Sequence, residues 1–157
     1  MKLKVIARLL LIACVGFSLS GCGKSPEPAP KAAAPQAAPK VIVFEEAALF
    51  DFDKADLKPE GKGQIKAYRE QAQADLSRAD KVRVTGYTDN SGNADYNTKL
   101  SLQRAEAVRD YLVSIGVDAT KIEASGAGDA TPIADNATTE GRAKNRRVEI
   151  EVTGLGR

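Results

Sequence analysis

KVRVTGYTDNSGNADYNTKLSLQRAEAVRDYLVSIG, which covers residues 81–116, combines a strand, a turn and a long helix in one continuous run. Lys81 to Thr88 alternates valines with polar residues, the period of two that is typical of a half-buried strand. Asn90 to Asn93 is rich in turn-forming residues, and Asn97 to Ile115 then spaces its apolar residues by three and four until Gly116. The run predicts a strand followed by an amphipathic helix.

The segments on either side predict further strands and helices. After Pro59, apolar residues follow helical spacing at Ile65, Tyr68, Ala72 and Leu76. The remaining predicted elements are extended segments at Val41–Phe44, Ala47–Phe52, Ile122–Ser125 and Arg147–Val152, and a short helix at Thr139–Lys144. We predict an α+β fold of two layers, with helices packed on one face of a small mixed four-stranded sheet in the order β-α-β-α-β-β.

Arg104 interrupts the apolar face of the helix predicted after the turn. At about 100° per residue, its position lies inside the arc formed by Leu100, Ala107, Val108, Tyr111, Leu112 and Ile115. An isolated charge on a buried face is too costly to retain, so its guanidinium must find an anion. An internal salt bridge, an arginine that reaches out to solvent, and a bound anionic ligand all remain open.

The first 21 residues are predicted to be a lipoprotein signal peptide. Three positive charges precede Leu9–Leu19, an apolar run of eleven residues that spans roughly 16 Å as a helix, too short for about 30 Å of hydrocarbon. The following Leu19-Ser20-Gly21-Cys22 resembles a bacterial lipobox, in which Cys22 becomes the lipidated N-terminus. Gly23 stands where aspartate would signal inner-membrane retention, so we expect a lipid anchor in the outer membrane with the domain facing the periplasm.

Residues 22–40 are predicted to be the lipidated cysteine plus an extended linker, and residues 41–157 the folded domain. Five of the seven prolines lie between Gly23 and Lys40, spaced too closely for a helix. The folded part carries 17 basic and 20 acidic residues, which argues against nucleic-acid binding. It has no histidine or cysteine, the residues that usually bind zinc or copper and that activate or supply a catalytic nucleophile. We therefore expect no zinc or copper site, no Ser-His or Cys nucleophile and no cofactor.

Three other motifs are discounted. Asp89–Asp95 begins like a calcium loop but has Ala94 at the position that requires glycine. Gly126-Ala127-Gly128 lacks the third glycine of a dinucleotide-binding loop. Asp51 and Asp53 would point to opposite sides of an extended chain, which argues against a glycosidase pair.

Five spaced motifs resemble the signature of OmpA-like C-terminal domains. They are Gly86-Tyr87-Thr88-Asp89, Tyr96-Asn97, Leu100-Ser101, Arg104-Ala105 and Asn145-Arg146-Arg147-Val148-Glu149, with further similarity at Phe52-Asp53-Lys54 and Leu57–Gly61. The resemblance covers nearly all of residues 41–153. Together with the lipobox and the linker, the whole chain resembles a peptidoglycan-associated lipoprotein.

The resemblance implies that the domain binds the diaminopimelate of the peptidoglycan stem peptide. This ligand carries an ammonium and a carboxylate on one carbon. By the resemblance, Asp89 takes the ammonium and Arg104 takes the carboxylate through two parallel hydrogen bonds, as a cation whose anionic partner arrives with the ligand.

Five further residues border the ligand in this interpretation. Asn97 and Thr88 add hydrogen bonds, although a purely structural role as a cap or strand-end bond is the alternative for both. Leu100 is an apolar wall, and Phe52 and Asp53 lie at the edge of the pocket.

The sequence thus predicts a non-enzymatic outer-membrane lipoprotein that tethers the outer membrane to peptidoglycan without a covalent bond. A role as an adaptor that docks a Tol-like or other envelope protein is compatible with this prediction. A wall hydrolase that uses carboxylates is the alternative from another functional class, since it would release sugar or peptide from wall fragments.

Overall fold

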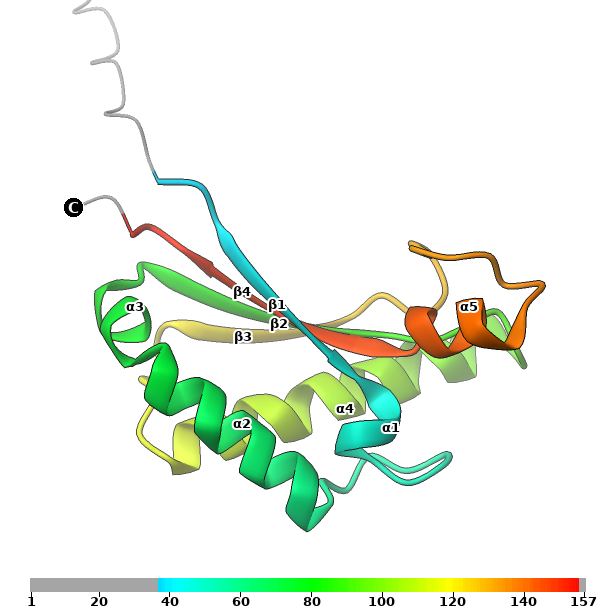
Figure 1. Cartoon of the computed structure of the whole chain (residues 1–157), viewed down its shortest axis with the longest axis horizontal. Helices are drawn as coiled ribbons and strands as arrows, with labels where there is room; N and C mark the ends of the chain where they lie inside the picture. The colour runs from blue at the N-terminus through cyan, green and yellow to red at the C-terminus, as the bar shows by residue number, and fades with distance from the viewer. Residues whose placement is uncertain (1–36, 156–157) are drawn as a thin grey trace, which may run out of the picture. The chain divides into compact units, whose positions relative to one another are not determined.

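The computed structural model describes residues 37–155, so the predicted signal peptide, Cys22 and most of the linker lie outside the described residues. The elements in chain order are β1 (Lys40–Glu45), α1 (Glu46–Leu49), α2 (Pro59–Gln71), α3 (Gln73–Arg78), β2 (Lys81–Tyr87), α4 (Ala94–Ser114), β3 (Ile122–Gly126), α5 (Thr139–Asn145) and β4 (Arg147–Thr153) (Figure 1).

The four strands form one mixed sheet in the order β1-β4-β2-β3. The last strand, β4, lies between β1 and β2 and is antiparallel to both, whereas β2 and β3 run parallel. A parallel pair needs a crossover connection, and α4 supplies it. The predicted α+β fold with a mixed four-stranded sheet is confirmed.

Helices α2 and α4 lie together on one face of the sheet (Figure 1). Valines and isoleucines of β2 and β4, such as Val82, Val84 and Ile150, meet Leu112, Val108 and Ile65 of the helices in a single apolar core. The period of two in the strands and of three to four in the helices directs these side chains inward. The opposite face of the sheet carries polar pairs such as Arg83 with Glu151.

Three expectations about the elements need correction. Ala47–Phe52 is not extended: Glu46–Leu49 forms the short helix α1, and a turn follows Phe50. The helix after Pro59 ends at Gln71, and α3 starts at Gln73. The long helix begins three residues earlier than predicted, at Ala94, because the Asn93 side chain caps it by accepting hydrogen bonds from the N–H groups of Asp95 and Tyr96.

The strand directions bring three chain segments to the same end of the sheet. Because β4 is antiparallel to both neighbours, its first residue lies beside the last residues of β1 and β2. Glu46 directly follows β1, Asp89 follows β2 by two residues, and Arg146 directly precedes β4. These three charged residues therefore start from neighbouring positions.

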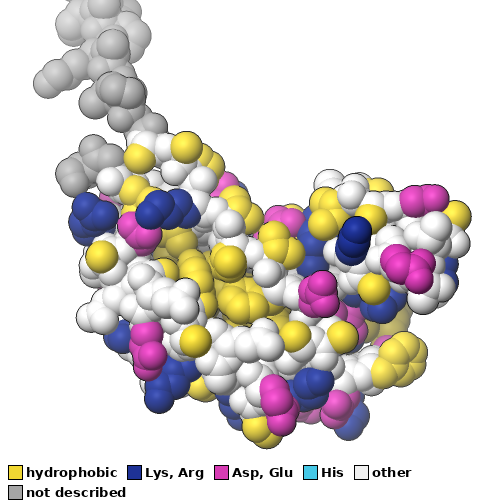
Figure 2. Space-filling view, in the orientation of Figure 1, with side chains coloured by type: hydrophobic (Ala, Val, Ile, Leu, Met, Phe, Trp, Pro, Cys, Tyr) yellow, Lys and Arg dark blue, Asp and Glu magenta, His cyan; other side chains and the backbone are white. Residues whose placement is uncertain are grey.

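Apolar side chains also gather in a hollow on the face shown in Figure 2. A small pocket of about 190 Å³ lies between β1 and α2, where it is lined by Val41, Ile42 and Tyr68 among others. It shares no residue with the larger pocket described below. Within residues 37–155, none of the helices has the length and apolar composition needed to cross a membrane.

Candidate functional site

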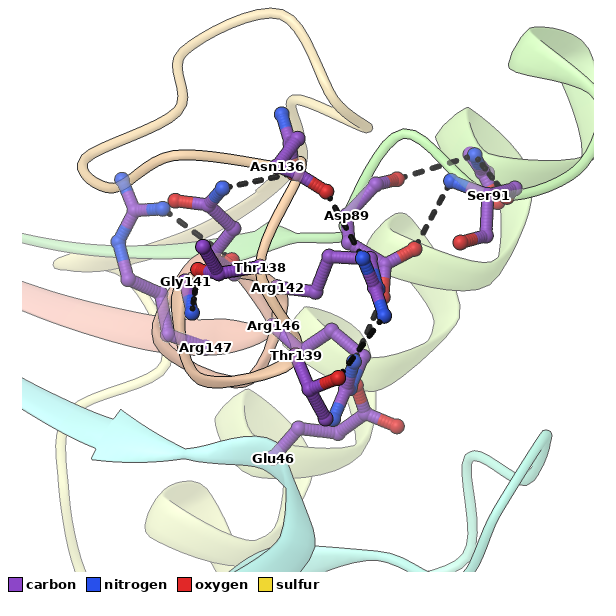
Figure 3. Close-up of polar contacts among 12 residues, drawn as sticks. Glu46, Asp89, Ser91, Asn136, Thr138, Thr139, Gly141, Arg142, Arg146 and Arg147 are labelled. Carbon is purple, nitrogen blue, oxygen red and sulfur yellow. Dashed lines mark hydrogen bonds and ion pairs between the residues drawn. The ribbon is translucent and has the colours of Figure 1, made fainter.

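Four charged side chains form an alternating chain at the end of the sheet. Nη2 of Arg104 lies 2.6 Å from Oε1 of Glu46, and Oε2 of Glu46 lies 3.5 Å from Nε of Arg146. Nη1 of Arg146 then donates to Oδ2 of Asp89 at 2.6 Å (Figure 3). We call this set the charge chain. In space it runs from Arg104 through Glu46 and Arg146 to Asp89, so Arg104 and Asp89 are its two ends.

Arg104 projects from α4 and is held on two sides. It is 3 % exposed, and its Nε donates to the backbone oxygen of Lys54 at 2.9 Å. Its guanidinium carbon lies 5.5 Å from the centre of the Phe50 ring, a cation–π distance. The internal salt bridge left open from the sequence is therefore present, with Glu46 as the partner. The expectation that Arg104 waits without an anionic partner was wrong.

Burial raises the pKa of both acids in this set of four side chains, but the opposing interactions outweigh it only at Asp89. Glu46 is only 6 % exposed, and burial raises its pKa above 4.5, although the guanidinium groups of Arg104 and Arg146 oppose that rise. Burial would also raise the pKa of Asp89. Hydrogen bonds from Arg146 and from the N–H of Ser91 outweigh it, so that the pKa of Asp89 lies below 3.8.

The loop after α1 forms one rim of the site. Asp53 has a φ of +59°, a left-handed conformation that is uncommon for a residue with a side chain. The hydroxyl of Tyr96 donates to Oδ1 of Asp53 at 2.6 Å and ties this loop to α4. Phe52, next to it, is 93 % exposed. The loop presents an apolar ring and a carboxylate beside Arg104.

Asn97 and Thr88 are both buried beside Asp89. The amide of Asn97 donates to the backbone oxygens of Asp89 and Ser91, at 3.3 and 2.9 Å, so it fixes the turn that carries the acid. Among residues 37–155, two buried side-chain oxygens have no hydrogen-bond donor: Oγ1 of Thr88 and Oε2 of Glu46. Both belong to residues that line the same pocket.

Helix α5 forms the opposite rim and is closely tied to its loop. The side chain of Asn145, fully buried, accepts from the N–H groups of Ile133 and Ala134 and donates to the oxygen of Ala134. Arg142 donates to the backbone oxygens of Asn136 and Ala137 and to the hydroxyl of Thr139 (Figure 3). These bonds hold the guanidinium of Arg142 at the edge of the site.

All these residues surround one pocket of about 510 Å³. It is lined by Glu46, Phe52, Asp53, Thr88, Asp89, Ser91, Gly92, Tyr96, Asn97, Leu100, Arg104, Thr139, Arg142 and Arg146. The lining contains three arginines and three acids, so its formal charge is zero. Such a pocket suits a small polar ligand that carries charges of both signs.

The seven ligand-binding residues predicted from the sequence all line this pocket, and their role toward a ligand stays a prediction. The sequence reasoning did not assign Glu46, Arg146, Arg142 or Tyr96. Arg146 lies inside a motif that the resemblance had already singled out, which was an available signal. Glu46 gave no signal, because it lies between the two segments predicted to be extended and in none of the motifs.

Comparisons with known proteins agree with the fold. A family model described as the OmpA family matches residues 49–146. Outer membrane protein A of Bordetella avium is 46 % identical over 129 residues, which is 82 % of this chain and 61 % of that protein. The probable lipoprotein YiaD of Escherichia coli K12 is 44 % identical over 106 residues, 68 % of this chain and 48 % of that protein.

A solved structure extends the similarity to three dimensions. The peptidoglycan-associated lipoprotein from Burkholderia pseudomallei superposes with a TM-score of 0.58 at 28 % identity, over 67 % of this chain and 87 % of that one. The chain spans about half to three fifths of the length of the two curated relatives.

Proposed function

The chain belongs to the OmpA family, and from this premise we propose that it binds peptidoglycan without a covalent bond and tethers the outer membrane to the cell wall. OmpA-family domains of this kind are non-enzymatic, so a wall hydrolase is not proposed. The names of the relatives support this proposal: one is an outer membrane protein and another is a peptidoglycan-associated lipoprotein.

The pocket binds the zwitterionic end of diaminopimelate in this proposal. One observation carries it: Arg104 and Asp89, the two ends of the alternating charge chain, line the same neutral pocket. The ligand's carboxylate binds Arg104 and its ammonium binds Asp89, so that the ligand closes the chain into a ring of alternating charges. Since Glu46 already holds one edge of the Arg104 guanidinium, the ligand's carboxylate shares this arginine with Glu46.

The remaining lining residues complete the recognition. Oγ1 of Thr88, buried and without a donor among residues 37–155, accepts a hydrogen bond from the ammonium. Leu100 and Phe52 contact the methylene chain of the ligand, and Asn97 keeps the turn of Asp89 in place.

A binding assay with purified peptidoglycan tests the proposal. The wild-type protein should sediment with diaminopimelate-type walls and not with walls that carry lysine at that position. Arg104→Lys should weaken binding about 30-fold or more, because truncating one partner of a desolvated charge pair costs about 2–5 kcal/mol and an ammonium lacks the planar fork. Arg83→Lys, on the open face of the sheet, is the matched control. Equal sedimentation of wild type and Arg104→Lys would refute the site.

The proposal includes a lipid anchor at Cys22 and the division into residues 1–21, 22–40 and 41–157. The lipobox motif supports it, as does the probable lipoprotein among the relatives. A linker of eighteen residues in polyproline geometry would reach roughly 55 Å, enough to hold a domain below a membrane. A Tol-like or other envelope partner stays a prediction from the sequence.

A further inference from the structure

Glu46 occupies the centre of the charge chain, between Arg104 and Arg146, and all three residues line the pocket. It is 6 % exposed, its Oε1 lies 2.6 Å from Arg104, and its Oε2 lies 3.5 Å from Arg146. No other carboxylate within residues 37–155 forms an ion pair with Arg104. This acid therefore determines how much positive charge the two guanidiniums present to a ligand.

We propose that Glu46 is a specificity-determining residue, whose negative charge keeps the pocket neutral and so makes it select a zwitterionic group over an anionic one. The inference rests on the proposed function and adds a residue to it. With Glu46 present, three acids balance three arginines in the lining. Without its charge the lining carries a net positive charge, because Asp53 and Asp89 alone face three arginines. Asp89 is already paired with Arg146.

The chemistry of the ligand makes this charge balance decisive. A carbon that bears both an ammonium and a carboxylate is neutral overall, whereas the same carbon with an acetylated amine is an anion. A neutral pocket favours the first, because the ammonium finds acids to match the arginines that bind the carboxylate. A pocket with excess positive charge attracts the anion and repels the ammonium.

The test compares two synthetic stem peptides that differ only in acetylation of the side-chain amine of diaminopimelate. The affinity ratio of free amine over acetylated amine is measured for wild type and for Glu46→Gln, which keeps the size and one hydrogen-bond acceptor. We expect the ratio to fall about tenfold in Glu46→Gln, the effect of one unit charge about 6 Å away at an effective dielectric of about 40. Any steric effect of the acetyl group is common to both proteins and cancels.

Glu123→Gln is the matched control. This acid pairs with Lys81 and does not line the pocket, so its neutralisation should leave the ratio unchanged. An unchanged ratio in Glu46→Gln, or an equal fall in Glu123→Gln, would overturn the inference.

Arg146→Gln provides a second test that does not depend on the folding of Glu46→Gln. The Arg146 side chain is 35 % exposed, so its replacement is better tolerated. Its loss leaves an excess of negative charge, and the ratio should rise about tenfold. A constant or lower ratio contradicts the inference. If wild type binds neither peptide, the proposed function itself fails; if it binds the free amine and the ratios stay constant, only the role of Glu46 is lost.

Discussion

Arg104 is the residue at which stability and the proposed binding depend on the same contacts. Its guanidinium is buried, pairs with Glu46 and donates to the backbone of Lys54. Removal of one member of a buried ion pair leaves the other charge unpaired in a medium of low polarity, which is more costly than replacing both. The arginine therefore cannot be removed for binding studies without a change in stability.

We expect Arg104→Met to lower the free energy of unfolding by about 3–5 kcal/mol, because Glu46 is left as a buried charge with only a distant contact to Arg146. The double variant Glu46→Leu with Arg104→Met should recover part of this loss. Urea unfolding of wild type, both single variants and the double variant measures these values. Arg83→Met, at an exposed pair, should cost about 1 kcal/mol or less. Losses that simply add in the double variant would contradict a coupled pair.

Asp89 gives a prediction about pH. Its pKa is lowered below 3.8 in the folded protein, so it contributes stability above that pH and loses the contribution as pH falls through the lowered pKa. The stability difference between wild type and Asp89→Asn should be constant from pH 7 to about pH 5 and shrink below pH 3.8. Urea unfolding at pH 7, 5 and 3 measures it; a difference that grows in acid would be inconsistent with the pair to Arg146.

For single residues, the sequence indicated which side chains are unusual but not which side chains they form ion pairs with. Arg104 was identified because helical periodicity placed it on an apolar face. Glu46 lies 58 positions away, and only the strand order and the short helix α1 bring it to Arg104. Long-range ion pairs leave no periodic signal, so the anion could be expected but not named.

The position of α4 against the sheet determines where the proposed binding residues lie. Gly86 of β2 and Gly126 of β3 face the backbone around Ser101, and a side-chain carbon at either position would collide with that backbone. The hydroxyl of Ser101 accepts a hydrogen bond from the N–H of Gly128 at 3.0 Å. Helix and sheet are therefore in contact through their backbones at Ser101. Along α4, Ser101 lies four residues after Asn97 and three residues before Arg104.

Gly86→Ala should separate α4 from the sheet and lower the free energy of unfolding by about 1–3 kcal/mol or more, the usual cost of overpacking. Gly63→Ala is the matched control in α2. An added carbon there meets no atom within 4 Å, and alanine in a helix interior should raise stability by about 0.5–1 kcal/mol. Thermal unfolding of both variants checks this contrast; a neutral Gly86→Ala would mean that α4 has room to move.

Local patterns predicted most of these elements and failed where the chain turns. The strands and α4 have clear periods of two and of three to four. Ala47–Phe52 has the composition of a strand, but the chain leaves the sheet after Glu45 and Glu46 begins a helical turn. The chain then turns through the left-handed Asp53. Side-chain contacts such as Tyr96 to Asp53 hold that turn, and these contacts are set by tertiary structure.

The whole molecule combines a wall-binding domain with a membrane anchor in our proposal. The proposed anchor predicts that Cys22→Ser abolishes palmitate labelling and leaves the precursor uncleaved. Gly23→Asp should move the protein to inner-membrane fractions, and an Ala37→Ser variant in the linker should change neither property. Labelled Cys22→Ser protein would rule out the lipobox.

The pocket itself was predictable as a set of residues but not as a geometry. The motifs and the resemblance that they carry named seven of its members. The neutral balance of three acids and three arginines depends on the meeting of β1, β2 and β4 at one end of the sheet, with α4 and α5 on either side. Such a balance cannot be obtained from net charge, which describes the chain as a whole.

The thermal unfolding midpoint with and without a diaminopimelate-containing stem peptide, for wild type and for Arg104→Lys, tests the central claim most directly. Ligand that binds only the folded state raises the midpoint by mass action. We predict a rise for wild type that grows with peptide concentration and no rise for Arg104→Lys, whatever the starting stability of that variant. A rise of equal size in both proteins would contradict the assignment of Arg104 to the ligand's carboxylate.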